Sequence, residues 1–513
     1  MVVTLLSTVL GFGREVVNAR FFGTQSDMDA FLAAATIPTI LFGIFNGALV
    51  SALVPVFTEY ASRGRTEDVW RLGSTVFNVL LIALTLLAAL GYLYAPVYVP
   101  LVAHGFSAQQ IAETVEMTRW LMPGIVGTSL AGVTAAMLNA HHRFGATALQ
   151  GVAINVVTIA GVVIFDRRLG IYALVLGTAL GLFAQLAVQL PSLLRHHLYR
   201  RVIDLRHPGM RRLFVSLAPI IVGSAAGQIA IFFDRFFAST LGPGYIAGMN
   251  YAAKLVGFPQ QVFAAAIATV IFPLLASQFA ISNRAAIRRS VVTGLRLVVG
   301  ITVPAVFLLI AFGQPIVRTL FERGAFGPSA SALCAGLLPY AAIGLVGTAS
   351  SVVLARCGFA FNAIRGTVAI SVFTVVTNVA LSLAWLPSLG ARGLLLANSL
   401  SQWMQALLLF VMVYRLIGGL DWRTIARAFA RVTICSVVMV AIASWIGGLV
   451  PAGEDFATRA FSLTVELGLA ALVFLAVARL LGVEEVTIAV RMVLSTLRSR
   501  VPAPPENRET PVA

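Results

Sequence analysis

The chain has 513 residues, of which 59% are hydrophobic and 11% are charged, and its formal net charge is +16. So few charges on so long a chain exclude a soluble globular protein. The basic residues lie mainly in short loops between apolar segments, where such residues orient a membrane protein during insertion. The positive charge therefore does not indicate nucleic-acid binding.

Apolar segments long enough to cross ~30 Å of hydrocarbon recur along almost the whole chain. Because lipid cannot hydrogen-bond the backbone, each segment must be a helix. The sequence predicts an all-α polytopic membrane protein with about 14 transmembrane helices. The predicted spans are 2–22, 29–60, 72–103, 111–140, 146–165, 170–195, 210–240, 246–279, 290–313, 331–357, 364–386, 391–417, 426–450 and 457–481.

Several features refine these spans. The long second and eighth spans contain Pro38 and Pro259, which predict bends because proline removes a helical hydrogen bond. The first span contains Arg14, Glu15 and Arg20 and lacks a basic leader region, so we expect a retained helix rather than a signal peptide. Most Lys and Arg residues follow even-numbered spans, which predicts that both termini are cytoplasmic.

A shift of 218 residues places the second span on the eighth. Under this shift, Ala34, Ala35, Phe45, Ala48 and Pro55 meet Ala252, Ala253, Phe263, Ala266 and Pro273. An even number of intervening spans leaves the two copies parallel, which predicts two parallel six-helix lobes around a central cavity. The predicted units are an N-terminal lobe (1–195), a basic cytoplasmic linker (196–212), a C-terminal lobe (213–417), two additional helices (418–481), and a cytoplasmic amphipathic segment with a disordered tail (482–513).

Ionisable residues inside the spans are costly and usually face a cavity or a partner. Lys254 is the only lysine in the chain and lies in the eighth span. It either attracts an anion such as a pyrophosphate or forms a structural contact. Arg14 either pairs with Glu15 or binds a phosphate. Asp29 suits a helix N-terminus, where a carboxylate is stabilised by the helix dipole.

Asp234 lies deep in the seventh span beside Arg235 and needs a partner. That partner is either Arg235 or a cation that amide groups of other spans help to coordinate. Motifs for metalloprotease, nucleotide-binding or serine-hydrolase chemistry are missing from the sequence, so we expect no enzyme activity. Because the sequence also lacks a nucleotide-binding loop, any transport by such a protein is expected to draw on an ion gradient, the membrane potential or a partner.

Several short segments resemble the MurJ (MviN) lipid II flippases, in order along nearly the full chain. They are Gly13-Arg14-Glu15, Ala19-Arg20-Phe21-Phe22-Gly23, Asp29-Ala30-Phe31, Val54-Pro55-Val56-Phe57, Gly105-Phe106, Leu138-Asn139-Ala140 with Arg143-Phe144, Tyr251-Ala252-Ala253-Lys254-Leu255, and Leu320-Phe321-Glu322-Arg323-Gly324. The resemblance implies fourteen helices and a cavity that faces the two sides of the bacterial inner membrane alternately.

The resemblance also implies site residues. Arg14, Asp29 and Lys254 match functional charged positions of the family, and Arg20 is a further candidate for substrate binding. Some relatives bind sodium in the C-terminal lobe, and the matching positions are Asp234, Asn378, Asn398 and Ser382. Coupling to sodium or to the membrane potential is therefore expected. The expected partners are a lipid-linked saccharide, membrane lipids and cell-wall polymerases.

The chain departs from the family at three places. Thr8 stands where a basic residue is common, Gly257 replaces an acidic one, and the stretch Thr36–Gly43 lacks the usual arginines. The leading expectation is a lipid II flippase. The alternatives are a flippase for another undecaprenyl-linked oligosaccharide and a cation-coupled exporter of small molecules.

Overall fold

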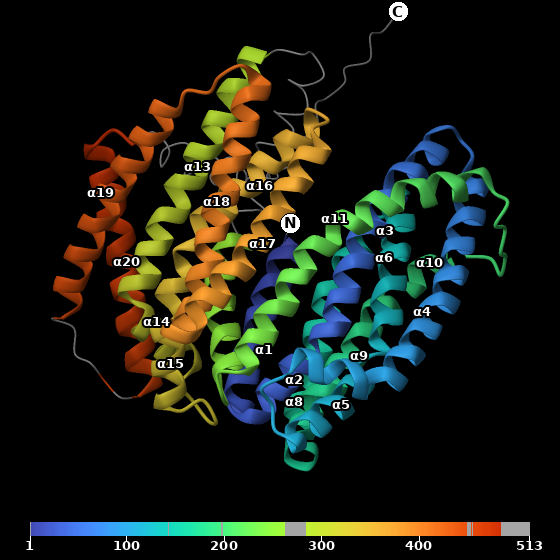
Figure 1. Ribbon diagram of the computed structural model, residues 1–513, viewed down its shortest axis with the longest axis horizontal. Coiled ribbons are helices and arrows are strands. Elements are labelled where there is room, and N and C mark those ends of the chain that lie inside the picture. The colour runs from blue at the N-terminus through green and yellow to red at the C-terminus, as the bar shows by residue number, and fades with distance from the viewer. Residues whose placement is uncertain are drawn as a thin grey trace, which may run out of the picture.

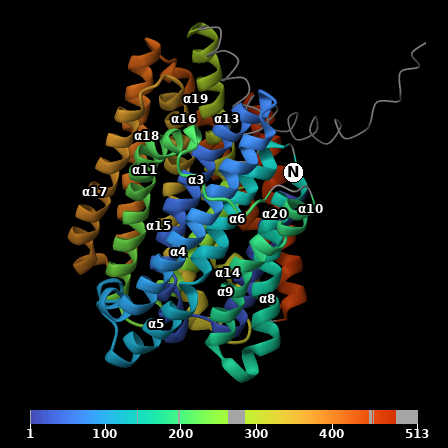
Figure 2. The same cartoon turned by 90° about the vertical axis from the view of Figure 1, so that its right-hand side faces the viewer.

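Every regular element in the part of the chain described by the computed structural model is a helix. That part comprises residues 2–483 except 142, 196–198, 262–283, 449–452 and 454. In Figure 1 the helices lie side by side in two groups, with α11 also packed on α3 of the first group; Figure 2 views the molecule from the side of the first group.

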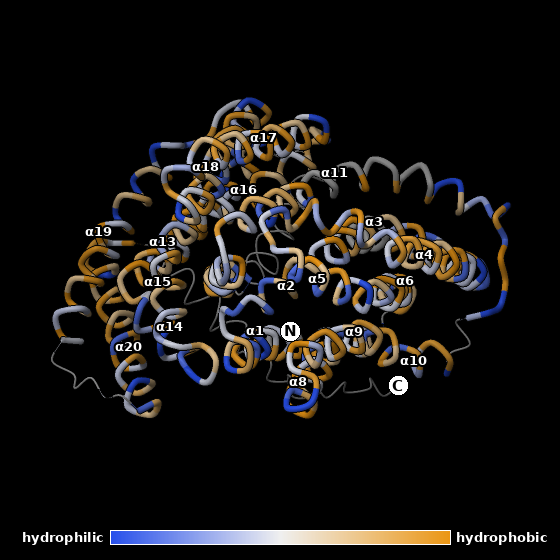
Figure 3. Tube along the Cα trace, turned by 60° about the horizontal axis from the view of Figure 1, so that its bottom comes forward, coloured by the Kyte–Doolittle hydropathy of each residue, from blue (hydrophilic) through white to orange (hydrophobic). Residues whose placement is uncertain are grey.

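The first group, called the N-lobe, contains the elements from α1 to α10. They are α1 (Val2–Phe22), α2 (Ser26–Ala34), α3 (Thr36–Ser62), α4 (Thr66–Val102), α5 (Ala108–Leu121), α6 (Gly124–Ala140), α7 (Phe144–Ala148), α8 (Gln150–Leu169), α9 (Ile171–Ala187) and α10 (Leu190–Arg195). Hydrophobic residues cover much of α4, α8 and α9, whereas hydrophilic residues gather at helix ends (Figure 3). This distribution suits helices that contact lipid along their length.

The second group, called the C-lobe, contains α11 to α18. They are α11 (Pro208–Ser239), a helical segment at 245–261, α13 (Arg284–Ala311), α14 (Gly313–Phe321), α15 (Pro328–Ala342), α16 (Gly344–Ala360), α17 (Ile364–Leu389) and α18 (Ala391–Ile417). The helix bounds repeat those of the N-lobe. Val102 ends α4 and Phe321 ends α14, 219 residues later, and Ala140 ends α6 and Ala360 ends α16, 220 residues later. The helices thus follow the predicted repeat of two parallel lobes.

The break predicted in the second span lies at Ala35, three residues before Pro38. Proline cannot donate to the carbonyl four residues earlier, and its ring crowds that carbonyl, so the helix breaks ahead of it. The carbonyl concerned belongs to Ala34, and the Thr118 hydroxyl of α5 donates to it at 3.4 Å. The break is therefore compensated by a neighbouring helix.

Two further helices follow the C-lobe and are called the appended pair: α19 (Trp422–Gly447) and α20 (Phe456–Leu480). α19 packs on α13 and on α20, and α20 also contacts α14. Asp421 and Asp455 cap their N-termini by accepting hydrogen bonds from Thr424 and Thr458. The hydrogen bonds from the Thr424 side chain and backbone hold the pKa of Asp421 below its usual range, so this cap is charged at neutral pH.

Ten helices or kinked helical units in the described ranges are long and apolar enough to cross a membrane. The pair α15 and α16, bent by 42° at their junction, adds an eleventh if it is one span. The predicted number of 14 spans remains a prediction. The later part of the eighth span, with the second-copy positions from Phe263 to Pro273, lies outside the described residues, as does the segment predicted at 484–513.

Candidate functional site

A cavity of about 760 Å³ lies between the two lobes. On the N-lobe side it is lined by residues of α1, α2, α3, α5, α6, α8 and α9. On the C-lobe side it is lined by α11, the segment 245–261, α15, α16 and α18. Most lining side chains are apolar, so the few charged groups are the ones that select a ligand.

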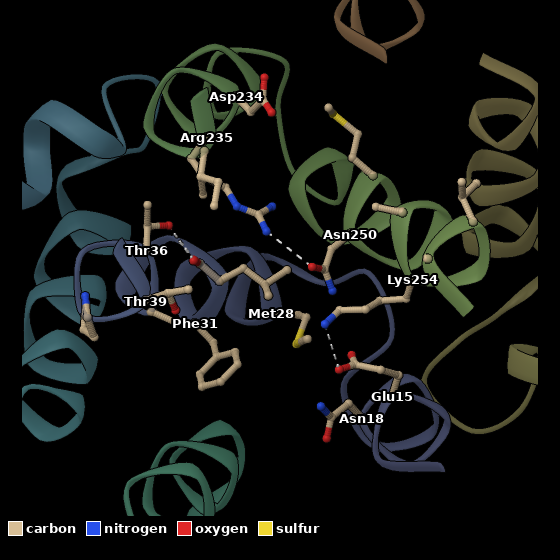
Figure 4. Close-up of a pocket in the computed structure, with 18 of the residues that line it drawn as sticks. Glu15, Asn18, Met28, Phe31, Thr36, Thr39, Asp234, Arg235, Asn250 and Lys254 are labelled. Carbon is tan, nitrogen blue, oxygen red and sulfur yellow. Dashed lines mark hydrogen bonds and ion pairs between the residues drawn. The ribbon is translucent and has the colours of Figure 1, made fainter. Parts of the chain in front are cut away.

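Three of these charged groups form one cluster on α1 and the segment 245–261. The Arg14 guanidinium pairs with Glu15 Oε1 at 2.8 Å, and the Lys254 ammonium lies 3.5 Å from the same oxygen. Glu15 and Lys254 face each other across the gap between their helices (Figure 4). The Glu15 side chain is 6% exposed and the Lys254 side chain is 43% exposed. One buried carboxylate thus holds two cations, which leaves a net positive charge at the cavity wall.

A second polar group joins α11 to the same segment 245–261, one turn before Lys254. Arg235 of α11 donates to Asn250 Oδ1 at 3.3 Å and to the Ile246 carbonyl at 3.4 Å. Its guanidinium points toward Asn250, and the Asp234 carboxylate points away from it (Figure 4). Asp234 and Arg235 therefore do not pair with each other but have separate partners, because the side chains of neighbouring residues on a helix point in different directions.

Asp234 instead faces α17. Asn378 Nδ2 donates to Asp234 Oδ1 at 3.5 Å. Asn378 and Ser382 are buried, and their Oδ1 and Oγ atoms lack hydrogen-bond partners among the described residues. Asn398 of α18 lines the cavity together with Asp234. Carboxylate, amide and hydroxyl oxygens are the ligands that a hard cation prefers. In the described ranges, no group of three or more His, Cys, Asp or Glu residues could hold a metal ion.

Asp29 lies outside the cavity lining, at the end of the molecule where α1 finishes. It is fully buried, and it accepts hydrogen bonds from the backbone N–H groups of Gly244 and Ala247. A carboxylate at the start of the segment 245–261 is stabilised by the unpaired N–H groups and the helix dipole. Asp29 lies in the first turn of its own helix α2, as expected, and it also caps a helix of the other lobe, which was not expected.

Arg20 also lies away from the cavity lining, and its side chain is exposed. Its carbonyl accepts a hydrogen bond from Ala325 N at 2.8 Å. Arg20 and Asp29 therefore belong to the contact between the lobes. We call this contact the seam. It consists of Asp29 and four glycines, Gly23, Gly105, Gly244 and Gly324. A Cβ atom added to any of these glycines would lie within 3 Å of the backbone of the other lobe.

The sequence missed three residues of the cavity. Glu15 was considered only as a partner of Arg14, and its contact with Lys254 depends on the packing of two helices distant in sequence. Arg235 was considered only beside Asp234. Asn18, one turn after Arg14 on α1, lines the cavity with its Oδ1 atom unpartnered among the described residues. Its spacing from Arg14 and Glu15 on one helix was the available signal.

The structure also locates the three departures from the family pattern. Thr8 lines a smaller pocket of about 240 Å³ that shares Arg14, Glu15 and Lys254 with the main cavity. Gly257 lines the main cavity. In the helix-two stretch, a Cβ on Gly43 would lie 2.5 Å from the Gln228 side chain of α11. α3 thus packs tightly on α11 at the end of the stretch that lacks arginines.

Known proteins resemble this chain over most of its length. A family model described as "Lipid II flippase MurJ" matches residues 18–457. The "Lipid II flippase MurJ" of Burkholderia cenocepacia is 30% identical over 418 residues, which cover 80% of this chain and 81% of that protein. The "Probable lipid II flippase MurJ" of Vibrio cholerae is 28% identical over 94% of both chains.

Solved structures show the same fold. A lipid II flippase MurJ in an inward closed conformation superposes with a TM-score of 0.77 at 21% identity, covering 94% of this chain and 98% of that one. An inward-facing multidrug resistance transporter of the MATE family, from the MOP superfamily, gives a TM-score of 0.69 at 14% identity, covering 81% and 98%. The match over residues 18–457 and the relative at 30% identity show that this chain belongs to the MurJ family.

Proposed function

We propose that this chain is a flippase that moves lipid II from the cytoplasmic to the periplasmic leaflet by alternating access. The family and the apolar helices make it a multi-pass inner-membrane protein. Within the proposal, both termini are cytoplasmic, and residues 1–195 and 213–417 are the two moving bodies, joined by the basic linker at 196–212. The relatives' names supply lipid II as the substrate.

The observation that carries the proposal is the positive cluster in an otherwise mostly apolar cavity. Lipid II carries a diphosphate, and charge-assisted hydrogen bonds from arginine and lysine are the strongest contacts available to it. Arg14 and Lys254 have one carboxylate between them, so one positive charge is left for the diphosphate. A cavity of about 760 Å³ suits a headgroup, while the lipid tail stays in the membrane.

We further propose that Asp234, Asn378, Ser382 and Asn398 form a sodium site that couples transport to the ion gradient. The support is two oxygens, one on Asn378 and one on Ser382 a turn later on α17, that have no hydrogen-bond partner in the described part of the chain. The Asn378 amide also reaches the Asp234 carboxylate at 3.5 Å. Lipid II delivered to the outer leaflet is consumed by cell-wall polymerases, which makes these enzymes the expected partners.

The test is rescue of cells depleted of their own lipid II flippase. We expect the chain to restore growth, and we expect Lys254→Ala to abolish rescue because the cavity loses its exposed cation. Lys254→Arg should rescue in large part because it keeps the charge. The exposed Arg479, at the far end of α20, provides the matched control, and Arg479→Ala should rescue like the parent.

Membrane levels of every variant are measured in parallel. Normal growth with a well-expressed Lys254→Ala chain would remove the headgroup role of Lys254. If the parent chain is present in the membrane but does not restore growth, lipid II is not its substrate, and another undecaprenyl-linked oligosaccharide takes its place in the proposal.

A further inference from the structure

The loop between α14 and α15 of the C-lobe contacts the end of α1 in the N-lobe. Ala325 N donates to the Arg20 carbonyl at 2.8 Å. Gly324 has a φ of +60°, and an added Cβ there would lie 2.3 Å from the same carbonyl. A Cβ on Gly23 would lie 2.3 Å from the Ala325 carbonyl. The loop and α1 therefore touch backbone to backbone, and this contact needs both the glycines and an accurately placed loop.

The repeat gives this contact a counterpart. In the N-lobe, the loop between α4 and α5 carries Gly105, whose N–H donates to Ser239 Oγ at the end of α11 at 3.2 Å. A Cβ on Gly105 would lie 2.3 Å from the Ser239 carbonyl. Each lobe thus places the loop after its third span on the end of the other lobe's first helix. The two contacts join the lobes at this end of the molecule.

The appended pair supports the loop between α14 and α15. Glu322, the first residue after α14, pairs with Arg459 of α20 at 3.1 Å and with Arg318 of α14 at 3.4 Å. Its side chain is 11% exposed, and that of Arg459 is 25% exposed. The Arg323 guanidinium lies over the Phe456 ring of α20, 4.6 Å from its centroid. Figure 1 shows the loop after α14, the start of α20 and the end of α1 at the same end of the molecule.

The charges explain why this support is needed. A carboxylate just after a helix C-terminus meets the negative end of the helix dipole, which disfavours it unless cations lie close by. Arg318 and Arg459 supply these cations, and Arg459 comes from outside the lobe. Two ion pairs fix Glu322 in place, and with it Arg323, the one residue between Glu322 and Gly324.

We propose that Arg459 is a positioning residue for the outer gate: through Glu322, α20 holds the loop at 322–326 against α1 and sets how readily the cavity opens to the outside. The appended pair is then part of the gating machinery of the two lobes. This inference depends on the alternating access of the proposed function.

The test is a labelling experiment on spheroplasts. Cys334, Cys357 and Cys435 are replaced by alanine, and Thr348→Cys provides a reporter in the cavity lining. A membrane-impermeant maleimide added outside labels the reporter only when the outer end opens. Arg459→Ala should raise the labelling rate by roughly two- to fivefold, the range expected for losing a partly exposed ion pair.

Three variants separate positioning from a general loss of structure. Arg459→Lys keeps the charge and should label at close to the parent rate. Arg479→Ala lies on the same helix at its far end and should change nothing. The charge-exchanged double variant Glu322→Arg with Arg459→Glu should label more slowly than either single variant.

An Arg459→Ala rate equal to the parent rate would overturn the inference while leaving alternating access intact. Equal increases for Arg459→Ala and Arg479→Ala would also overturn it, because the effect would then belong to α20 in general. A reporter that is never labelled from outside, even in the parent, would contradict the proposed alternating access on which the inference depends.

Discussion

Glu15 decides how Arg14 and Lys254 act. From the sequence, a structural ion pair and a substrate contact were alternatives for each cation. The structure places both cations on one carboxylate oxygen, so the cluster is a structural ion pair that still carries one excess positive charge. Lys254, with 43% of its side chain exposed, is the member that can turn to a ligand. The two roles therefore coexist in one cluster.

The sequence indicated which charged residues belong to the candidate site but not which residues they contact. Lys254 and Asp234 stood out because a charge inside an apolar span needs a reason. The contact of Lys254 with Glu15 joins helices of different lobes, and no pattern within either helix encodes it. The same holds for Asp29, whose two backbone partners lie 215 and 218 residues away. Capping was predictable from its chemistry, whereas the helix that it caps was not.

The proposed sodium site yields a prediction for single residues. Replacing choline chloride with sodium chloride at equal ionic strength should raise the melting temperature of the purified protein by roughly 1–3 °C, since a ligand that binds only the folded state stabilises it. Asp234→Asn should lose this increment because it removes the charged ligand. The exposed Asp27→Asn should keep it. The same sodium response in Asp234→Asn and parent would contradict the proposed site.

At the scale of elements, hydropathy placed the helices well because it acts locally, whereas of the two prolines predicted to bend a span only Pro38 lies near a break: the helical segment 245–261 runs through Pro259. The second span breaks at Ala35, next to the predicted position at Pro38. The repeat was visible in a few identities and extends in the structure to the bounds of most helices. The contacts between lobes could not be predicted, because they depend on backbone approaches at Gly23, Gly105 and Gly324 that tertiary packing creates.

The seam yields a prediction for these contacts. In Gly105→Ala, the new methyl group would lie 2.3 Å from the Ser239 carbonyl, so the two lobes must separate locally. We expect a loss of about 1–3 kcal/mol of stability, the usual cost of overpacking a rigid site. Gly327→Ala, a loop glycine whose added Cβ meets no atom within 4 Å, is the control. The measurement is thermal unfolding, and equal melting temperatures for the two variants would show that the seam is not tightly packed in solution.

At the scale of the whole molecule, two lobes enclose a cavity and meet at one end through the seam. The cavity cluster also joins the lobes, since Glu15 belongs to the N-lobe and Lys254 to the C-lobe. A ligand anion that draws Lys254 away from Glu15 would weaken a contact between the lobes. Substrate binding and lobe movement are thereby connected through one pair of residues, which is what alternating access requires.

The measurement that tests this account most directly is translocation of lipid II by the purified protein in proteoliposomes, under a sodium gradient and a membrane potential. Fluorescent lipid II in the outer leaflet is followed with a membrane-impermeant quencher. The account predicts that the chain transfers lipid II between leaflets far faster than protein-free vesicles, that Lys254→Ala does not, and that Lys254→Arg does. Transfer at the protein-free rate by folded parent protein would contradict it.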